Sequence, residues 1–283
     1  MSDIAEGFSH APADADAARR VRVETRLSTS AFLAEPLRRL GYDSREMWAW
    51  DNYKTTVMGF IRHCRENGRV GPDGRVRMLE IGGGRGPLLT PDEADSAGVR
   101  LTVNDIDARE LAMASDRFDK ACFDVSAGFD PQWAGSFDLL VSKMVFEHVK
   151  GAPKAWTNAR ALLAPGGVAM AFHPVLYAPP FVVNWLMPET LTARVLRYFF
   201  PDRHDGDYPK FPARYEMCFA MPSKVAPILA DCGFSETLIA PFFGHRYFRH
   251  LPGLRNADAA FSALAERNDW RAFCSYAFTL ARR

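Results

Sequence analysis

The chain has 283 residues, of which 48% are hydrophobic and 12% aromatic, enough to bury a full core as one large domain or as a domain with a cap. Intrinsic disorder is therefore excluded for most of its length. The 35 basic and 34 acidic side chains leave a net charge of +1, which argues against a nucleic-acid partner because it provides no general attraction to a polyanion.

The cysteines and the lack of a long apolar run indicate the cellular compartment in which the protein is expected. The five cysteines are widely spaced, odd in number and without a C-x-x-C pair, which favours a reducing compartment and argues against disulfides or a metal site. The first 20 residues hold no signal-peptide pattern, so we expect a cytoplasmic protein. The apolar segment 179–200 is interrupted by Pro188, Glu189, Arg194 and Arg197, so it cannot span a bilayer, although contact with a membrane surface stays open.

The N-terminal part divides into an arm and a helical region. Residues 1–25 are rich in small and charged side chains, and we expect them to form a flexible arm. Within 26–70, the apolar spacing from Phe32 to Leu40 predicts one helix, and a second is expected from Ser44 to about Glu66. This second helix carries a stripe of large side chains, which fits either core packing or a lid over a ligand: Trp48, Trp50, Tyr53, Met58, Phe60 and Ile61.

From residue 71 onwards, strand and helix patterns alternate. Strands are predicted at 76–81, 101–105, 121–124, 137–142 and 168–172, and helices at 91–97, 108–118 and 153–163. A helix from Ser223 to Gly233, a strand near 237–242, a helix around 257–266 and a strand at 273–281 follow. This alternation is typical of a doubly wound α/β fold, a mostly parallel sheet with helices on both faces. Ligands of such sheets bind beyond the carboxyl ends of the strands.

The first strand leads into a glycine-rich turn, Gly82-Gly83-Gly84-Arg85-Gly86-Pro87. Glycines let the backbone turn sharply there and pass close to a ligand. A dinucleotide fingerprint would need glycine where Pro87 stands, and the Glu80 carboxylate would repel a pyrophosphate, so NAD is disfavoured. The same carboxylate would attract the α-ammonium group of an amino acid.

Acidic residues also end the next two strands. Asp105 is placed to bind both hydroxyls of a ribose. Asp124 is placed to accept a hydrogen bond from an exocyclic amine such as that of adenine, with the N–H of Val125 beside it. One such carboxylate would fit a simple helix cap. Three in succession favour a bound nucleoside.

Four stretches resemble the successive motifs of class I S-adenosylmethionine-dependent methyltransferases: Glu80-Ile81-Gly82-Gly83-Gly84-Arg85-Gly86, Asn104-Asp105-Ile106-Asp107, Phe137–Ser142 with Phe146-Glu147-His148-Val149, and Leu162–Gly167. The resemblance implies a seven-stranded sheet, S-adenosylmethionine as methyl donor and S-adenosylhomocysteine as product. It implies that Glu80, Gly82 and Gly84 hold the methionine portion. Asp105 and Ile106 would then hold the ribose, Asp124 and Val125 the adenine, and Ser142 and Lys143 would lie against the methionine end.

Methyl transfer from a sulfonium is an in-line displacement, so the protein mainly has to position the acceptor atom. A hydroxyl acceptor also needs a general base, and His148 and His173 follow the fourth and fifth strands. An insertion at 174–221 begins apolar and continues polar, which suits either an amphipathic acceptor or a purely structural cap. Within it, Tyr215 and the pair His204 and Asp205 are further candidates for orienting or deprotonating the acceptor.

We therefore expect a methyltransferase domain at 71–283 that acts on a small, lipophilic or amphipathic metabolite. In the family that the chain resembles, an Asn/Asp-Pro-Pro-Tyr sequence after the fourth strand marks transfer to amide or exocyclic base nitrogens. Ser142-Lys143-Met144-Val145 stands there instead, so the resemblance disfavours such acceptors. Two alternatives stay open at this stage. One is a methyltransferase acting on RNA or protein, and the other is a non-catalytic nucleoside-binding scaffold.

Overall fold

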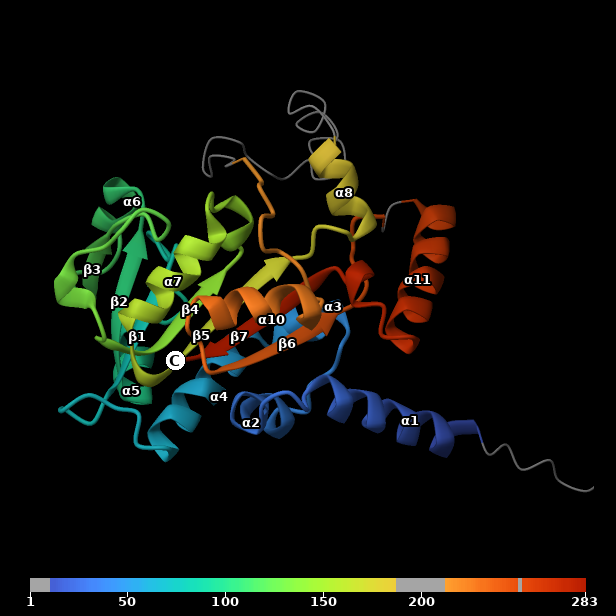
Figure 1. Ribbon diagram of the computed structural model, residues 1–283, viewed down its shortest axis with the longest axis horizontal. Coiled ribbons are helices and arrows are strands. Elements are labelled where there is room, and N and C mark those ends of the chain that lie inside the picture. The colour runs from blue at the N-terminus through green and yellow to red at the C-terminus, as the bar shows by residue number, and fades with distance from the viewer. Residues whose placement is uncertain (1–10, 187–211, 249–250) are drawn as a thin grey trace, which may run out of the picture.

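The computed structural model describes residues 11–186, 212–248 and 251–283. Its centre is a seven-stranded sheet in the order β3-β2-β1-β4-β5-β7-β6 (Figure 1). Neighbouring strands are parallel except for β7, which is antiparallel to both β5 and β6. The strands are β1 (Val76–Ile81), β2 (Val99–Asp105), β3 (Asp119–Cys122), β4 (Phe137–Lys143), β5 (Leu163–Pro174), β6 (Glu236–Phe242) and β7 (Tyr276–Arg282).

This arrangement confirms the predicted α/β class, with helices on both faces of a mostly parallel sheet. Central strand β4 shows why: its residues Phe137 to Ser142 are all buried, as expected for a strand covered on both sides. Leu139 and Val141 belong to one core cluster and Leu140 to the other, because successive side chains point to opposite faces. The sheet thus separates two hydrophobic cores.

The helices divide between these cores. The first core includes side chains of α2 (Ala31–Arg39), α4 (Tyr53–Glu66), α5 (Pro91–Ala97) and α6 (Ala108–Ala112). The second includes side chains of α7 (Ala152–Leu162) and α10 (Pro222–Asp231), which lie over the opposite face of the sheet in Figure 1. Helix α11 (Pro252–Arg267) follows β6 and stands at the far end of the sheet.

Several element boundaries differ from the sequence expectation. Helix α6 ends at Ala112 instead of near residue 118, and β5 begins at Leu163, five residues earlier than predicted. The last strand starts at Tyr276, because Arg271–Phe273 form a short 3-10 turn. These differences occur at element ends, where local patterns are weakest.

The N-terminal region differs more. Residues 11–25 were expected to belong to a flexible arm, but Ala11–Arg26 form helix α1, consistent with the high helix propensity of its alanines. The predicted helix over 44–66 is two helices, α3 (Glu46–Asp51) and α4, separated at Asn52, whose backbone (φ −106°, ψ 10°) is not helical. Trp50 and Tyr53 therefore stand on either side of a bend.

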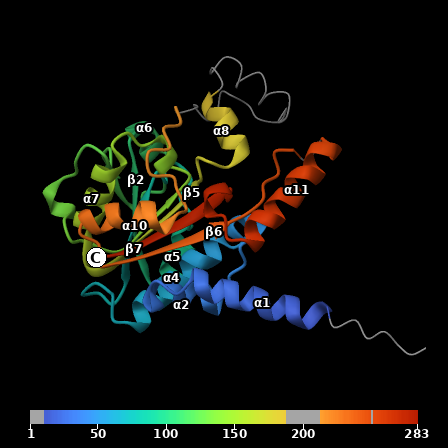
Figure 2. The ribbon, with the colours of Figure 1, turned by 45° about the vertical axis from the view of Figure 1, so that its right-hand side comes forward.

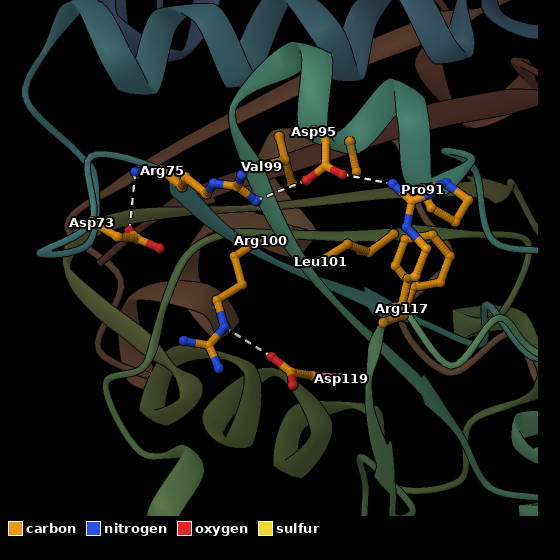
Figure 3. A pocket seen from close by; sticks show the side chains of 11 residues that line it. Asp73, Arg75, Pro91, Asp95, Val99, Arg100, Leu101, Arg117 and Asp119 are labelled. Carbon is orange, nitrogen blue, oxygen red and sulfur yellow. Dashed lines mark hydrogen bonds and ion pairs between the residues drawn. The ribbon is translucent and has the colours of Figure 1, made fainter.

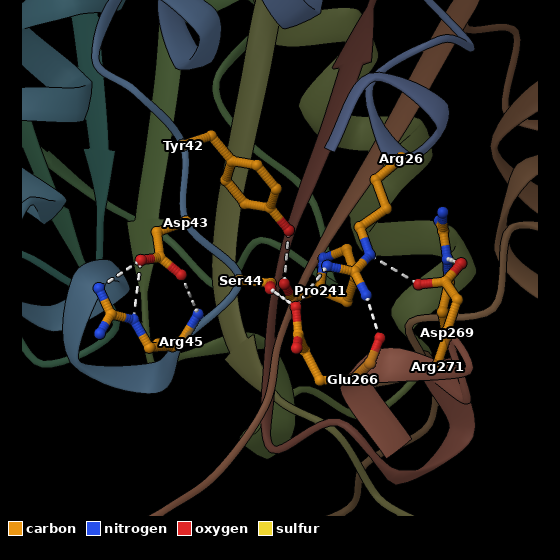
Figure 4. Close-up of polar contacts among 9 residues, drawn as sticks. All are labelled: Arg26, Tyr42, Asp43, Ser44, Arg45, Pro241, Glu266, Asp269 and Arg271. Atoms are coloured by element: carbon orange, nitrogen blue, oxygen red, sulfur yellow. Dashed lines mark hydrogen bonds and ion pairs between the residues drawn. The ribbon is translucent and has the colours of Figure 1, made fainter. Parts of the chain in front are cut away.

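A buried arginine joins this region to the C-terminal part of the chain (Figure 4). Arg26 is 1% exposed; its Nε donates to Asp269 Oδ1 at 2.7 Å and its Nη2 to the Glu266 carbonyl at 2.6 Å. Ser44 Oγ donates to Glu266 Oε1 at 2.7 Å, and Tyr42 Oη donates to the Pro241 carbonyl at 2.6 Å. The N-terminal helices are thus attached to β6 and α11.

The insertion after β5 begins with helix α8 (Pro179–Leu186), which Figures 1 and 2 show beyond the carboxyl ends of the parallel strands. The expected cap at 174–221 lies partly outside the described residues, and so do the candidates His204 and Asp205. Residues 212–221 return to the sheet, where Leu176 N donates to the Cys218 carbonyl at 2.9 Å.

Candidate active site

The glycine-rich turn lies at the carboxyl end of β1, and its conformation requires glycine. Gly82 has φ 73°, and a Cβ there would lie 2.5 Å from Val145 Cγ2. At Gly83 a Cβ would lie 2.9 Å from Val103 Cγ1, and Gly84 has φ 47°. Real Cβ atoms do not approach other carbons so closely, and a positive φ strains other residues. The turn therefore requires glycine, because neighbouring side chains pack directly against its backbone.

Glu80 lies at the base of this turn. Both of its carboxylate oxygens accept from the Leu88 N–H, at 3.1 and 2.9 Å. Burial raises the pKa of the Glu80 carboxyl to about 7, although the Leu88 N–H and the Lys143 ammonium act in the opposite direction. A carboxyl group held this way would favour a cationic group of a ligand, because that cation would stabilise its ionised form.

Asp105 at the end of β2 faces the same turn. A Cβ on Gly84 would lie 3.0 Å from Asp105 Oδ2, while Asp105 Oδ1 accepts from the Asp107 N–H at 2.9 Å. Burial raises the pKa of Asp105, and the nearby Glu110 and Asp107 carboxylates add to this effect. The adjacent Ile106 side chain is 60% exposed.

Asp124 is the third acidic residue of the site. The backbone just before it is fixed by Asn104, a residue that the sequence did not single out for this purpose. Asn104 is buried, and its Nδ2 donates to the carbonyls of Ala121 and Phe123 at 2.8 and 3.0 Å, which fixes the end of β3. Asp124 follows directly, and its Oδ1 accepts from the Ser126 N–H and Oγ at 2.8 and 2.7 Å. Val125 is buried and accepts from Asn158 Nδ2 at 2.7 Å through its carbonyl.

At the end of β4, Ser142 is fully buried and Lys143 reaches the N-terminal helices. The Lys143 Nζ lies 4.8 Å from the ring centroids of both Trp50 and Tyr53. Burial lowers the pKa of this ammonium, and Glu80 raises it. Trp50 and Tyr53 belong to the aromatic stripe for which both core packing and a lid were considered. The structure shows core packing, because Tyr53 is buried in the first core. The lid role stays a prediction.

Of the three candidate catalytic groups, His148 has the most open position. Its Nδ1 donates to the Pro212 carbonyl at 3.2 Å, and one third of its side chain is exposed. The preceding Glu147 is buried, which raises the pKa of its carboxyl to about 8, and its Oε1 lies 3.8 Å from His148 Nε2. Glu147 Oε2 has no hydrogen-bond partner among the described residues. The sequence offered no signal for this buried acid beyond its place in a motif.

His173 lies deep inside the sheet, away from the strand-end groups. Its Nδ1 lies 3.0 Å from the Pro174 carbonyl, which can only accept, so Nδ1 carries the proton and Nε2 accepts from Thr279 Oγ1 at 2.8 Å. Burial lowers the pKa of His173 to about 4. Both ring nitrogens are thus engaged by the protein, and the structure does not bring this residue together with the other candidates.

Tyr215 joins an aromatic cluster beneath α8. Its backbone N–H donates to the Glu147 carbonyl at 3.0 Å, and its ring lies 6.2 Å from that of Phe181. Phe181 is 5.5 Å from Tyr276 and 5.6 Å from Tyr247 between centroids, and Tyr276 is 5.6 Å from Trp50. Burial raises the pKa of the Tyr276 phenol, and a hydrogen bond with Tyr247 acts in the same direction. Through Tyr276 this cluster contacts Trp50, whose ring lies next to the Lys143 ammonium.

A cavity of about 320 Å³ lies at the opposite, amino edge of the sheet (Figure 3). Its three arginines are paired with aspartates: Arg75 with Asp95 at 2.9 Å, Arg100 with Asp119 at 2.9 Å, and Arg117 with Asp92 and Asp95 at 2.7 Å. The charges in this cavity therefore balance one another, and it contains none of the candidate site residues. Asp73, the remaining acid of its lining, accepts from the Arg75 N–H at 3.1 Å.

Two features are absent from the part of the chain that the structure describes. No cluster of three or more histidine, cysteine, aspartate or glutamate side chains suited to a metal ion is found there. Within the same residues, no helix has the length and apolar character needed to cross a membrane.

Part of the chain is similar to known methyltransferases. Residues 79–169 match a family model described as a methyltransferase domain. The ubiquinone biosynthesis O-methyltransferase of Caulobacter sp. (strain K31) is 28% identical over 141 residues, which cover 44% of this chain and 54% of that protein. The chain thus spans about half the length of this curated relative.

Solved structures of methyltransferases also align with the chain. The phosphoethanolamine N-methyltransferase 2 of Haemonchus contortus, in complex with S-adenosylhomocysteine, is 15% identical with a TM-score of 0.45, over 74% of this chain and 49% of that one. The geranyl diphosphate C-methyltransferase of Streptomyces coelicolor A3(2) is 14% identical with a TM-score of 0.47, over 81% of this chain and 76% of that one.

Proposed function

The chain carries the methyltransferase domain of the class I S-adenosylmethionine-dependent family, and from this premise we propose that it transfers a methyl group from S-adenosylmethionine to a small, lipophilic or amphipathic acceptor. The observation that carries the proposal is the convergence of Glu80, the glycine turn and Asp105 at one edge of the sheet. The Glu80 carboxyl group matches the α-ammonium group of that donor. The glycine turn matches its methionine chain, and the Asp105 carboxylate matches its ribose.

Each predicted cofactor residue has a role in this proposal. Glu80 binds the α-ammonium group, and Gly82 and Gly84 let the methionine portion approach the backbone. Asp105 binds the ribose hydroxyls, and the exposed face of Ile106 covers the nucleoside. Asp124 and Val125 bind the adenine, while Ser142 and Lys143 lie against the methionine end. The donor supplies the electrophilic methyl group, and the protein holds it and excludes water.

The acceptor site lies between the strand ends and α8. Trp50 and Tyr53 of the N-terminal helices form one wall, which is the lid role considered for residues 26–70. Phe181, Tyr247 and Tyr276 form a packed aromatic layer behind this wall, and Tyr215 anchors the returning chain through the Glu147 carbonyl. For an acceptor that loses a proton, we assign the base to His148, because its imidazole is partly exposed at the strand edge.

We assign His173 a structural role, since both of its nitrogens are engaged. A reducing, cytoplasmic location is part of the proposal, and its support is that all five cysteines are free.

Titration calorimetry with S-adenosylmethionine and S-adenosylhomocysteine tests the proposal. The wild-type protein should bind both. Asp105→Ala should weaken binding by at least about tenfold, because the ribose hydroxyls lose a charged acceptor. The matched control is Asp119→Ala at the opposite edge of the sheet, where Asp119 only pairs with Arg100 on the surface. A wild-type protein that binds neither compound would contradict the proposed function.

A further inference from the structure

Helix α11 and the turn that follows it carry a group of exposed apolar side chains. Nine large apolar side chains are exposed in the described part of the chain, and five of them lie here: Leu251, Leu254, Leu264, Trp270 and Phe273. Each of the five is between 39% and 47% exposed. Single exposed apolar side chains are ordinary on a protein surface, but a group gathered on one element indicates an interaction site.

These side chains form one continuous face. Leu254, Phe261 and Leu264 are separated by seven and three positions, a spacing that places them on one side of a helix. Beyond Leu264, the Phe261 ring lies 5.5 Å from that of Phe273, and the Phe273 ring lies 6.4 Å from that of Trp270. Helix α11 has 16 residues and is therefore about 24 Å long, and the face extends over most of it. Figures 1 and 2 both show α11 at the outer edge of the molecule.

At the C-terminal end of this face lies a shallow groove of about 430 Å³. Trp270 and Phe273 line it from the turn after α11, and Met221 and Pro222 line it from the start of α10. These four side chains make the groove largely apolar, so it suits an aliphatic chain better than a polar group.

The charges of the same region leave cations at the surface. Arg255 and Arg267 are exposed, and neither forms an ion pair with any residue that the structure describes. The three acids of α11 and its following turn are engaged within the protein: Asp258 with His245 at 3.0 Å, Glu266 with Arg26 at 3.3 Å, and Asp269 with Arg26 and Arg271 at 2.7 and 2.8 Å. The apolar face is therefore flanked by positive charge.

A lipid surface fits this combination better than a second copy of the chain. If two copies met through this face about a two-fold axis, Arg255 and Arg267 of both copies would share one interface, and like charges repel. An anionic bilayer instead accommodates apolar side chains below its headgroups, a tryptophan at their level, and arginines beside the lipid phosphates.

We propose that α11 and the turn after it dock the protein on the surface of an anionic lipid bilayer, with the apolar face among the headgroups and Arg255 and Arg267 beside the phosphates. The helix lies along the surface. This inference goes beyond the proposed function and does not depend on it. The loop that leads into α11 carries Tyr247, whose ring lies 5.6 Å from that of Phe181 in α8, so docking here would bring the insertion after β5 close to the bilayer.

Flotation of the full chain with lipid vesicles tests the proposal. One set of vesicles is phosphatidylcholine alone, and the other is phosphatidylcholine with an equal part of phosphatidylglycerol. The wild type should bind the anionic vesicles at least about tenfold more strongly than the neutral ones, because each arginine near an anionic surface strengthens binding by about fivefold. High salt should reduce this preference.

Two double variants separate the apolar from the charged contribution. Leu254→Ser with Leu264→Ser should bind both kinds of vesicle at least about tenfold more weakly, since less apolar surface enters the bilayer. Arg255→Gln with Arg267→Gln should lose most of the preference for anionic vesicles. The matched controls are Met113→Ser, whose apolar side chain is 52% exposed at the end of α6, and Arg62→Gln, an exposed arginine of α4. Both controls should bind as the wild type does.

Unfolding in urea should show that the variants are folded, because all the replaced side chains are exposed. A wild type that binds neither kind of vesicle, or binds both equally, would overturn the proposal. So would a wild-type dimer, detected by light scattering, that becomes monomeric in the double leucine variant, because the face would then belong to a second copy. Binding of S-adenosylhomocysteine, measured separately by calorimetry, tests the proposed function whatever the vesicles show.

Discussion

Arg26 and Asp269 are separated by 243 positions in the chain, yet the buried Arg26 donates from its Nε to the partly exposed Asp269 Oδ1 at 2.7 Å. The pair joins the end of α1 to the segment that follows α11 (Figure 4). Through Ser44 and Glu266 the same network reaches the loop that precedes α3. The aromatic wall formed by Trp50 therefore depends on contacts made far from it in sequence.

Removing this arginine should destabilise the fold. Arg26→Leu leaves the partly buried acceptors of Glu266 and Asp269 without their guanidinium partner, and we expect the free energy of unfolding in urea to fall by about 2 kcal/mol. The control is Arg100→Leu, which removes an exposed pair with Asp119 and should cost less than about 1 kcal/mol. Equal losses in the two variants would show that the Arg26 network contributes no more than a surface pair.

The Glu80 carboxyl should make cofactor binding depend on pH. Because the pKa of this group is raised to about 7, it is largely protonated below that pH and cannot attract an ammonium group fully. We expect the affinity for S-adenosylmethionine to rise as the pH increases through about 7, measured by calorimetry at a series of pH values. In Glu80→Gln the affinity should be lower and this rise should be absent.

The same raised pKa affects stability with the opposite sign. A carboxyl group that ionises near pH 7 in the folded state, but near its ordinary pKa of 4.5 in the unfolded state, stabilises the fold fully below the lower value. This contribution is lost as the pH rises through about 7. The difference in unfolding free energy between wild type and Glu80→Gln should follow this course, and a difference independent of pH would contradict the burial of the charge.

The glycine turn allows a matched pair of substitutions. Gly82→Ala combines a positive φ of 73° with a Cβ 2.5 Å from Val145 Cγ2, and we expect a loss of about 2 kcal/mol or more in stability together with weaker cofactor binding. Gly86→Ala places a Cβ where no atom lies within 4 Å and should behave nearly as the wild type in both measurements. In the Gly82→Ala protein, Val145→Ala should restore part of the stability, since it removes the clash but not the strain. A fully active Gly82→Ala protein would count against this requirement for glycine.

His173 should make the stability of the fold depend on pH in the acid range. Its pKa is lowered to about 4 by burial, so the folded protein keeps the imidazole neutral while the unfolded chain takes up a proton near pH 6.5. Stability from this residue is fully present above pH 6.5 and is lost as the pH falls through about 4. His173→Gln should therefore be less stable than the wild type at neutral pH, with the difference shrinking on acidification. A difference that grows at low pH would contradict a neutral buried histidine.

Much of the fold follows from local patterns. The strand β1 and the helix α5 occur at the residues that their apolar spacing and flanking turns predict, and Asp105 ends its strand as expected. Asp124 was predicted to end the third strand, but β3 already ends at Cys122. Where local patterns were weak, the prediction failed. The alanines of α1 were interpreted as an arm, because a helix with few residues to bury is stabilised mainly by contacts elsewhere in the chain.

By itself, the sequence determined the class of fold, the glycine turn at the end of β1 and the acidic strand ends beside it, because each of these depends on residues close together in the chain. Only the tertiary structure decided which side chains share a space. It brought Trp50 and Tyr53 to Lys143, attached Arg26 to Asp269, and placed His173 inside the sheet with both nitrogens engaged. Burial and charge at a site arise from elements that meet only after folding, and no local pattern of residues contains them.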